Sequence, residues 1–420
     1  MMKKISKLRG MQDTDPIETS KINFVENIFY EISKSYGYQE VRFPIIESTD
    51  LFKRSVGDES DIVNKEMFTF ESKSGKSMTL RPEGTAGCMR MAIETGLLDA
   101  GQQRLSYKGP MFRYERPQKG RSRQFQQLSL EAYGFNDYAI DLEMLEISNF
   151  LFEKLSVKKE ITLEINSIGS QKDQQEYSRK LKDYFSKYKK DLDEDSLKRL
   201  QKNPLRILDS KNQNLENLIK EAPKIDQSIS KDSQEKFSLI KNYLEDLEIQ
   251  YKENPLLVRG LDYYNDLVFE WKSNSIGSQD TICGGGRYDS LSKIIGGRET
   301  NAIGLSIGLE RVCLLIEDSI EEDTKSLLIV SLEDSFFLDG MKLASSLRKN
   351  LNNFSIQFAG KEKNLKTLLK KANKKNTDFM VIIGREEIKN NSYTLKKLSI
   401  NQEMKINNFD SLLENLKKTK

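Results

Sequence analysis

The stretch FRYERPQKGRSRQFQQLSLEAYG, residues 112–134, predicts two strands joined by an arginine-rich loop. In the second strand Leu128, Leu130 and Ala132 alternate with a polar set: Gln127, Ser129, Glu131 and Tyr133. Because successive side chains of a strand point to opposite faces, one face of this sheet is apolar and the other carries a carboxylate. A buried carboxylate needs a donor partner, so we expect Glu131 to line a cavity together with Gln127.

The loop between these strands carries four arginines: Arg113, Arg116, Arg121 and Arg123. Arginine stays charged and can bind phosphate oxygens through two parallel hydrogen bonds. Four guanidinium groups would repel each other without an anion, although salt screens exposed charges over about 8–10 Å and a solvated loop could tolerate them. We interpret the loop as the rim of a nucleotide site. Phe125 could stack on a base there, and an ordinary core position is its alternative.

The chain has 420 residues and no histidine. This absence excludes Ser-His-Asp triads, Cys-His pairs, histidine-ligated zinc and an imidazole general base. The three cysteines, Cys88, Cys283 and Cys313, are far apart in sequence, which argues against disulfides and against a Cys-x-x-Cys metal site. Any catalysis must therefore depend on the placement of charge and the orientation of substrates.

The length predicts two or three domains. Residues 326–420 contain 18 Lys and Arg against 10 Asp and Glu, so this tail is a candidate for binding a polyanion. A lysine-rich solvated surface is the alternative. The N-terminus lacks an apolar run, and no stretch approaches 18 consecutive apolar residues. We therefore expect a cytoplasmic protein without a signal peptide or a membrane span.

The first helix is predicted to begin at Asp15-Pro16-Ile17-Glu18 and to end at Gly37. Further strands are expected at 39–43, 69–72, 77–80, 160–165, 256–258, 266–271 and 301–307, and further helices from 85, over 141–152 and over 308–317. Residues 171–254, with 18 basic and 17 acidic side chains, predict a helical insertion, with disorder as the weaker alternative. After a charged linker, Glu321-Glu322-Asp323, strands at 327–330, 355–358 and 379–383 alternate with helices at 338–351 and 365–372. This alternation predicts a small α/β domain with a partly parallel sheet.

Polar groups at four other places are candidate site residues. Glu83 could bind an ammonium group, although a turn with Thr85 as the helix cap is the simpler interpretation. Arg259 and Tyr264 lie between apolar strands, where polar groups are costly unless they serve a site; their opposite parity requires a bend at Gly260. Arg311 in a first helical turn suits a nearby anion, with an exposed surface arginine as the alternative. The run Gly284-Gly285-Gly286 either lets a ligand approach the backbone or forms a simple turn.

Taken in order, several motifs of the chain resemble those of the histidyl-tRNA synthetase family, which belongs to class II of the aminoacyl-tRNA synthetases: RGMQD (9–13), RPEGT (81–85), the arginine hairpin, RGLDYYN (259–265), GGRYD (285–289) and GLER (308–311). The likeness covers essentially the whole chain, and RGLDYYN is highly specific for this family and its paralogue. It implies an α+β catalytic domain with an antiparallel sheet over 1–325, interrupted by the helical insertion of about 171–254. An α/β anticodon-binding domain would follow over 326–420.

The resemblance also implies an activity and its partners. The activity is the ATP-dependent activation of L-histidine and its transfer to tRNA(His), with Mg²⁺, in a homodimer formed through the first helix and Phe43-Pro44. The implied histidine-binding residues are Glu83, Thr85, Arg113, Gln127, Glu131, Arg259, Tyr263 and Tyr264. The implied ATP-binding residues are Arg113, Glu115, Arg121, Phe125 and Arg311. By this resemblance Arg113 and Arg259 are catalytic, and no metal ligand is assigned.

One position departs from the family pattern, because many relatives have histidine where this chain has Gln126. Two alternative functions stay open at this point. The first is a non-catalytic paralogue, the regulatory subunit of ATP phosphoribosyltransferase, which lacks the tail; the basic tail and the complete Arg259 segment argue against it. The second is an RNA-binding module that no longer aminoacylates. Histidine-dependent ATP–pyrophosphate exchange would separate both from a synthetase.

Overall fold

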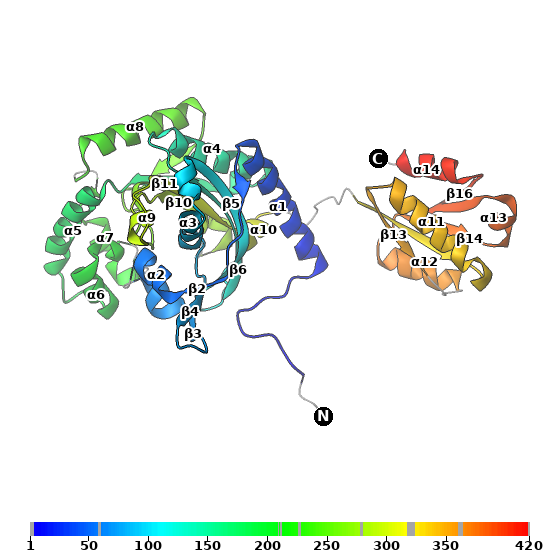
Figure 1. The fold of residues 1–420 in the computed structure, drawn as a ribbon, viewed down its shortest axis with the longest axis horizontal. Helices are drawn as coiled ribbons and strands as arrows, with labels where there is room; N and C mark the ends of the chain where they lie inside the picture. Colours follow the sequence, from blue (N-terminus) through cyan, green and yellow to red (C-terminus); the bar gives the residue numbers. More distant parts are fainter. Residues whose placement is uncertain are drawn as a thin grey trace. The chain divides into compact units, whose positions relative to one another are not determined.

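Figure 1 shows the fold of the chain in a computed structural model. The structure describes residues 4–57, 60–208, 210, 212–225, 228–277, 280–316, 324–359 and 364–418. The chain forms two compact units, residues 1–318 and 319–420, which are described separately. The predicted linker Glu321-Glu322-Asp323 lies outside the described residues, and so does Glu317, the expected last residue of the helix over 308–317. Among those residues, no helix combines the length and the apolar character needed to cross a membrane.

The first unit is built on an eight-stranded sheet in the order β1-β5-β6-β11-β10-β9-β7-β8. Only the pairs β1–β5 and β7–β8 are parallel. This largely antiparallel sheet confirms the expected α+β fold, and its central strands include both halves of the arginine hairpin. The strands are β1 (Gln39–Glu40), β5 (Gln103–Phe112), β6 (Gln124–Tyr133), β7 (Thr162–Ser167), β8 (Tyr251–Glu253), β9 (Asn265–Lys272), β10 (Thr281–Arg287) and β11 (Ala302–Gly308).

The apolar face of this sheet packs on three helices, α1 (Pro16–Ser35), α4 (Ala139–Lys154) and α8 (Lys231–Asp246). Leu128, Leu130 and Ala132 are buried in that core, as the alternation in β6 predicts. The expected start of α1 is confirmed, because the Asp15 and Glu18 side chains each accept a hydrogen bond from the other residue's backbone N–H. Packing on one face leaves the other face of β6 free to carry polar side chains.

A second set of elements lies toward the polar face of the sheet. The predicted hairpin around Gly75, which has a φ of +77°, is confirmed as part of a three-stranded sheet in the order β2-β4-β3. These strands are β2 (Ile46–Ser48), β3 (Phe68–Glu71) and β4 (Ser77–Leu80), and the nearby helices are α2 (Thr49–Val56), α3 (Thr85–Glu94) and α9 (Leu291–Ile294). Helix α10 (Leu309–Cys313) lies on the apolar side instead, where Leu309 and Val312 belong to the same core as α1. The segment Gln39–Phe43 contributes only a two-residue strand.

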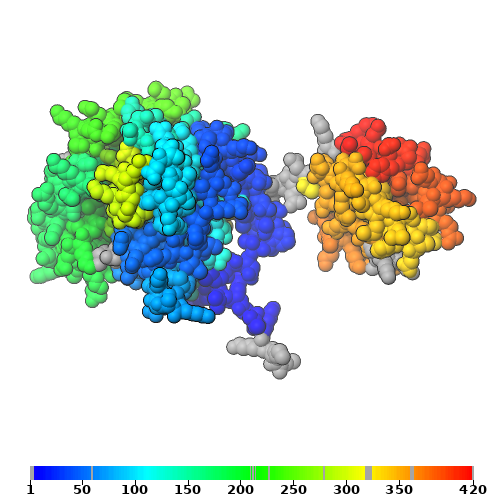
Figure 2. Space-filling view, in the orientation of Figure 1, coloured from blue at the N-terminus to red at the C-terminus, as the bar shows by residue number. Residues whose placement is uncertain are grey.

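The predicted insertion is folded, so the alternative of disorder is wrong for its described residues. Its helices are α5 (Gln171–Ser186), α6 (Glu194–Lys202) and α7 (Glu216–Lys220), and we call residues 171–220 the helical segment. Tyr177, Leu181 and Phe185 are fully buried in one core with Ile207. Figure 2 shows the helical segment (green) beside α2 (blue). Arg199 of the helical segment pairs at 2.7 Å with Asp61, which follows α2 in the chain. Helix α8, by contrast, covers the apolar face of the sheet.

Two sequence expectations in the sheet are wrong. Residues 256–258 form no strand, because the backbone N–H of Leu257 turns back to the carbonyl oxygen of Asn254 at 2.9 Å. The glycine run lies inside β10 and is not a turn. A Cβ at Gly284 would lie 2.5 Å from Arg259 Nη2, and one at Gly285 would lie 2.4 Å from the carbonyl oxygen of Gly304. Crowding from both sides of the strand therefore requires glycine here.

The second unit is the predicted small α/β domain. Its sheet has the order β13-β12-β14-β15-β16, with β12 parallel to both β13 and β14 and the other pairs antiparallel. Strands β15 and β16 and helices α13 and α14 were not expected from the sequence. The elements are β12 (Lys325–Ser331), α11 (Phe337–Asn350), β13 (Phe354–Phe358), α12 (Leu365–Lys374), β14 (Phe379–Ile383), α13 (Arg385–Asn390), β15 (Tyr393–Lys397), β16 (Gln402–Ile406) and α14 (Phe409–Lys417).

Candidate active site

Arginines from three distant stretches of the chain line one cavity of about 250 Å³ on the polar side of the large sheet. Arg113 follows β5, Arg259 precedes β9, and Arg311 lies in α10. We call this cavity the arginine pocket. Its lining also includes Glu115, Arg121, Phe125, Gln127, Glu270, Thr281, Gly284, Ser306, Gly308 and Glu310. Strands β5, β6, β10 and β11 thus place four guanidinium groups and several carboxylates around one space.

Arg113 and Arg311 are held in this pocket by backbone carbonyl groups. Arg113 Nε donates to the carbonyl oxygen of Pro82 at 2.9 Å, and its guanidinium lies 5.4 Å from the ring centre of Phe125. Arg311 donates from Nε to the carbonyl oxygen of Gly120 at 2.9 Å and from Nη1 to that of Thr281 at 2.5 Å. Burial lowers the pKa of Arg311 to about 10, with repulsion from Arg113 and Arg121 in the same direction. An anion in the pocket would relieve that repulsion.

Arg259 and Arg121 are each paired with carboxylates of the pocket. Arg259 forms an ion pair with Glu270, and Arg121 forms one with Glu115. Burial lowers the pKa of Arg259, but Glu270 and Tyr264 outweigh burial and raise that pKa overall. Glu66, which the sequence did not single out, lies 3.8 Å from Arg121 Nη2. Arg259 and Arg121 are therefore paired with carboxylates of the protein, and a bound phosphate group could take the place of those carboxylates.

Two buried side-chain atoms of the pocket have neither a hydrogen bond nor an ion pair in the described part of the chain. They are the Gln127 side-chain oxygen Oε1 and the Arg259 nitrogen Nε. A buried polar group without a partner costs free energy unless a ligand or water satisfies it. Gln127 Oε1 can accept a hydrogen bond, so it suits a donor such as an ammonium group. The atoms left unpaired are therefore those of two residues that the sequence analysis placed in the site.

Glu131 is fully buried and does not line the arginine pocket, so it does not share that cavity with Gln127. Its carboxylate instead accepts hydrogen bonds from Thr85 Oγ1 (2.8 Å), Tyr107 OH (2.9 Å) and Tyr288 OH. We call these four residues the Glu131 cage. Burial raises the pKa of Glu131 to about 8, although the three hydroxyl groups act in the opposite direction. A Cβ at Gly304 would lie 1.8 Å from Glu131 Oε2, so β11 must carry glycine opposite it.

Tyr107 and Tyr288 were not identified as site residues from the sequence. Tyr107 is 24 residues from Glu131 in the chain, and Tyr288 is 157 residues from it. Tyr107 belongs to β5 but precedes the stretch 112–134 that was singled out from the sequence, whereas Tyr288 lies inside the GGRYD motif. The sequence alone does not give the pairing of strands. Without the register of β5 against β6, it could not be predicted that the Tyr107 side chain lies on the same face of the sheet as Glu131.

The remaining residues expected to bind the amino acid lie beside the cage. The Glu83 carboxylate accepts from the backbone N–H groups of Thr85 (2.7 Å) and Ala86 (3.0 Å), so Glu83, and not Thr85, caps α3 with its side chain. The rings of Tyr263 and Tyr264 are buried, with their centres 4.8 Å apart. Residues 259–264 form a loop before β9, which lets the guanidinium of Arg259 lie 5.7 Å from the ring of Tyr264 despite their opposite parity.

Two arginines of the hairpin loop do not line the pocket, so the expected rim of four is wrong for them. Arg116 is exposed. Arg123 stacks on Tyr114 with its guanidinium 3.6 Å from the ring centre and donates to the carbonyl oxygen of Glu115 at 3.2 Å. Gln126 does not line the arginine pocket, and its backbone N–H, a group that histidine would also supply, donates to the Glu310 carboxylate at 2.8 Å.

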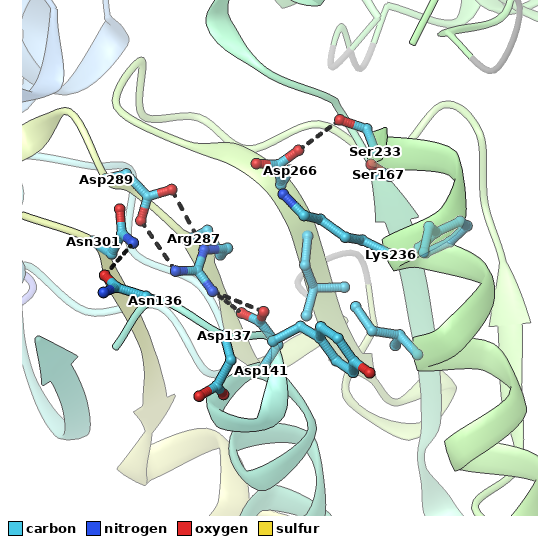
Figure 3. A pocket seen from close by; sticks show the side chains of 14 residues that line it. Asn136, Asp137, Asp141, Ser167, Ser233, Lys236, Asp266, Arg287, Asp289 and Asn301 are labelled. Atoms are coloured by element: carbon cyan, nitrogen blue, oxygen red, sulfur yellow. Dashed lines mark hydrogen bonds and ion pairs between the residues drawn. The ribbon is translucent and has the colours of Figure 1, made fainter. Parts of the chain in front are cut away.

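A second cavity, of about 130 Å³, lies between α4, α8 and β10 (Figure 3). Figure 3 shows Arg287 pointing between Asp141, at 2.8 Å, and Asp289, at 3.4 Å. Burial raises the pKa of Asp141 to about 7, with Arg287 acting in the opposite direction. Asp289 also accepts from Asn265 Nδ2 at 2.8 Å, next to Tyr264 in sequence. These groups satisfy one another, so the network holds the 259–265 loop in place.

Comparison with known proteins adds independent information. A family model described as "Histidyl-tRNA synthetase" matches residues 10–312, and one described as "Anticodon binding domain" matches residues 326–419. A histidine–tRNA ligase of Francisella philomiragia subsp. philomiragia is 47% identical over 401 residues, which are 94% of this chain and 95% of that protein. The corresponding protein of Francisella tularensis subsp. novicida is 45% identical over 421 residues, with 99% and 100% covered. The structure of apo histidyl-tRNA synthetase from S. aureus matches with a TM-score of 0.82 at 34% identity, covering 99% of this chain and 100% of that one.

Proposed function

The chain belongs to the histidyl-tRNA synthetase family, and from that premise we propose how its residues divide the reaction. The enzyme is a histidine–tRNA ligase. It activates L-histidine with ATP to histidyl-adenylate and pyrophosphate, and then transfers the histidyl group to tRNA(His) with release of AMP. The non-catalytic paralogue is disfavoured because it lacks a tail, whereas the tail of this chain matches an anticodon-binding domain.

We assign the arginine pocket to ATP. Arg113 would hold the α-phosphate, Arg311 the γ-phosphate, and Arg259 would bridge the α-phosphate and the carboxylate of the amino acid. Phe125 would stack on adenine beside Glu115, and Arg121 would close the hairpin loop over the nucleotide. The convergence of these side chains on one cavity supports the assignment.

The first step needs no general base, because the attacking carboxylate is already ionised. A bond forms between a carboxylate oxygen and the α-phosphorus, and the bond from that phosphorus to pyrophosphate breaks in line with it. Guanidinium groups lower the barrier by orienting both reactants and by neutralising charge that develops on the phosphate oxygens. This mechanism suits a chain without histidine.

We assign the Glu131 cage and its neighbours to histidine. Glu131 and Tyr264 would bind the two imidazole nitrogens, with Tyr263 beside them. Glu83, Thr85 and Gln127 would hold the α-ammonium group. The unpaired Oε1 of Gln127 supports this assignment, because an ammonium group supplies the missing donor. Since the cage hydroxyls already satisfy Glu131, an entering imidazole must exchange hydrogen bonds with them.

A magnesium ion fits the pocket residues. Glu270 and Glu310 are carboxylates in the lining, and oxygen donors are what Mg²⁺ prefers. Mg²⁺ commonly takes one or two ligands from carboxylates and the rest from phosphate and water. When bound, the ion would add positive charge beside the phosphates, and Glu270 and Glu310 would hold it.

We propose four further assignments. The tail over 326–420 binds the anticodon, in keeping with its excess of basic residues, and the helical segment lies near the acceptor stem. Two copies of the chain pair through α1 and the Phe43-Pro44 region, where four apolar side chains are exposed: Ile17, Tyr30, Ile45 and Ile46. The enzyme acts in the cytoplasm, where bacterial ribosomes use charged tRNA.

The observation that carries these assignments is the meeting of Arg113, Arg259 and Arg311 in one pocket. The test is ATP–pyrophosphate exchange across the set of amino acids. Exchange should depend on histidine, and Arg259→Ala should lower it by about 10³-fold, because a guanidinium between the two reacting groups is lost. The melting temperature of the variant should show that it still folds. Exchange within tenfold of wild type in a folded Arg259→Ala protein would remove Arg259 from the mechanism.

A further inference from the structure

The helical segment donates hydrogen bonds to the loop that carries Tyr263 and Tyr264, and the acceptor is one acidic side chain of that loop, Asp262. The Asp262 carboxylate oxygen Oδ1 accepts hydrogen bonds from Asn203 Nδ2 at 2.8 Å and from Arg206 Nε at 2.9 Å. Arg206 Nη2 lies 2.8 Å from the same oxygen. Both guanidinium nitrogens therefore converge on one carboxylate oxygen, and charge-assisted hydrogen bonds of this kind are roughly twice as strong as neutral ones.

Arg206 also reaches past Asp262 to the main body of the unit. Its side chain is only 9% exposed, and Nη2 donates to the carbonyl oxygen of Val56 at 3.3 Å. The same carbonyl accepts from the backbone N–H of Asp262, also at 3.3 Å. A Cβ on Gly57 would lie 1.9 Å from Asp262 Oδ2, so the carboxylate packs directly on the backbone there. Arg206 therefore fastens the loop to the end of α2.

Another side chain of the helical segment contacts the loop two residues further on. Gln174 in α5 donates from Nε2 to the carbonyl oxygen of Tyr264 at 2.9 Å and to that of Gly169 at 3.3 Å. Apolar packing follows the same path, because Tyr177 of α5 belongs to one hydrophobic cluster with Tyr263 and Tyr264. The polar and apolar contacts of the helical segment thus both end on the loop that carries these tyrosines.

We infer that Arg206 is a positioning residue for histidine binding, acting through Asp262 on Tyr263 and Tyr264. This inference rests on the proposed function, which assigns those tyrosines to the amino acid. The helical segment would then have a role in amino-acid binding that does not involve contact with RNA. Such a role requires no excess of positive charge, in keeping with the 18 basic and 17 acidic residues of the stretch 171–254.

The test is ATP–pyrophosphate exchange on the full chain, with KM measured separately for histidine and for ATP. Arg206→Ala should raise KM for histidine about tenfold, as expected for the loss of a charge-assisted hydrogen bond, and leave KM for ATP within about twofold. Arg206→Lys should recover most of the loss, because an ammonium group can still pair with Asp262. The matched control is Asp195→Ala, which removes another ion pair between the helical segment and the body, Lys65–Asp195 at 2.9 Å; it should change neither KM.

Each other outcome overturns the inference. A folded Arg206→Ala protein with unchanged KM for histidine contradicts it, as does an equal rise for both substrates or the same split in Asp195→Ala. Should Arg206→Ala fail to fold, Asp262→Asn decides, with a rise in KM for histidine of about threefold expected from the lost charge. An unchanged KM there also overturns the inference. Failure of the proposed function is a different result, namely no histidine-dependent exchange by the wild-type enzyme.

Discussion

The arginine pocket and the Glu131 cage lie beside each other but differ in solvent access and in the groups that would bind a ligand. The pocket is open, has a volume of about 250 Å³, and holds cations against carboxylates and carbonyl groups. The cage contains no exposed atom of Glu131, and three hydroxyl groups surround its carboxylate. A triphosphate can be bound by charge from several directions, whereas an imidazole ring must be distinguished from other side chains by paired hydrogen bonds.

Because of this difference, substitutions in the two regions should affect different properties of the enzyme. Removing one charge from the pocket should affect the chemical step, because the guanidinium groups act on charge that develops during the reaction. Perturbing the cage should affect protonation and the fit of one amino acid. The following three predictions test that division.

The largest effect is expected for Arg113→Gln in the arginine pocket. Exchange should fall by about 10³-fold, because the guanidinium facing the α-phosphate is lost while the hydrogen bond to Pro82 can be replaced by an amide. The measurement is histidine-dependent ATP–pyrophosphate exchange, with the melting temperature as a check on folding. Arg116→Gln is the matched control in the same loop; Arg116 is exposed and outside the pocket, so exchange should stay within about twofold. Equal losses in the two variants would contradict the assignment.

The next effect concerns stability and the pKa of Glu131, which burial raises from 4.5 to about 8. The folded protein keeps a proton that the unfolded chain releases, so the stabilising contribution of Glu131 is fully present below about pH 4.5 and is lost as pH rises through about 8. Glu131→Gln cannot titrate there. Between these limits the free energy of unfolding of wild type should fall relative to the variant by about 4 kcal/mol, roughly a thousandfold in the equilibrium constant.

Denaturant unfolding of both proteins at a series of pH values measures this difference. Asp141, whose pKa burial raises to about 7, changes stability in the same direction but is present in both proteins, so its contribution cancels in the comparison. Parallel stability curves for wild type and Glu131→Gln would show that Glu131 is ionised throughout. For the guanidinium groups of the arginine pocket no such titration is expected in this range, because even Arg311 keeps a pKa of about 10.

The sequence predicted the two regions unequally. The alternation of Leu128, Leu130 and Ala132 with polar residues is local, so it correctly placed Glu131 on the polar face of β6. The hydroxyl partners of Glu131 come from β5, from the residue after β10 and from the start of α3, and no local pattern encodes which elements lie beside one another. For the same reason the glycine run was mistaken for a turn, since only the approach of Arg259 and of the neighbouring strands explains it.

The convergence of the arginines was also beyond local reasoning. Arg113, Arg259 and Arg311 lie in three separate stretches, and their common site followed from resemblance to a family and not from spacing. Charge alone suggested four arginines around the hairpin loop, whereas Arg123 stacks on Tyr114 and Arg116 is exposed. The sequence therefore predicted which types of residue form the site. Which particular arginines line it depends on the pairing of distant strands.

The smallest effect expected is a difference in salt dependence between the two substrates. Raising sodium chloride from about 50 to about 300 mM shortens the range of electrostatic interactions from roughly 14 to 6 Å. KM for ATP should rise about threefold, because the pocket attracts a polyanion and remains open to solvent. KM for histidine should change by less than about 1.5-fold, because Glu131 is buried and its partners are neutral hydroxyl groups. Both constants come from the exchange assay at fixed pH, and potassium acetate replaces the chloride salt as a control for specific ion effects. An equal rise in both constants would mean that long-range charge also governs the cage, and the division between the two regions would then be wrong.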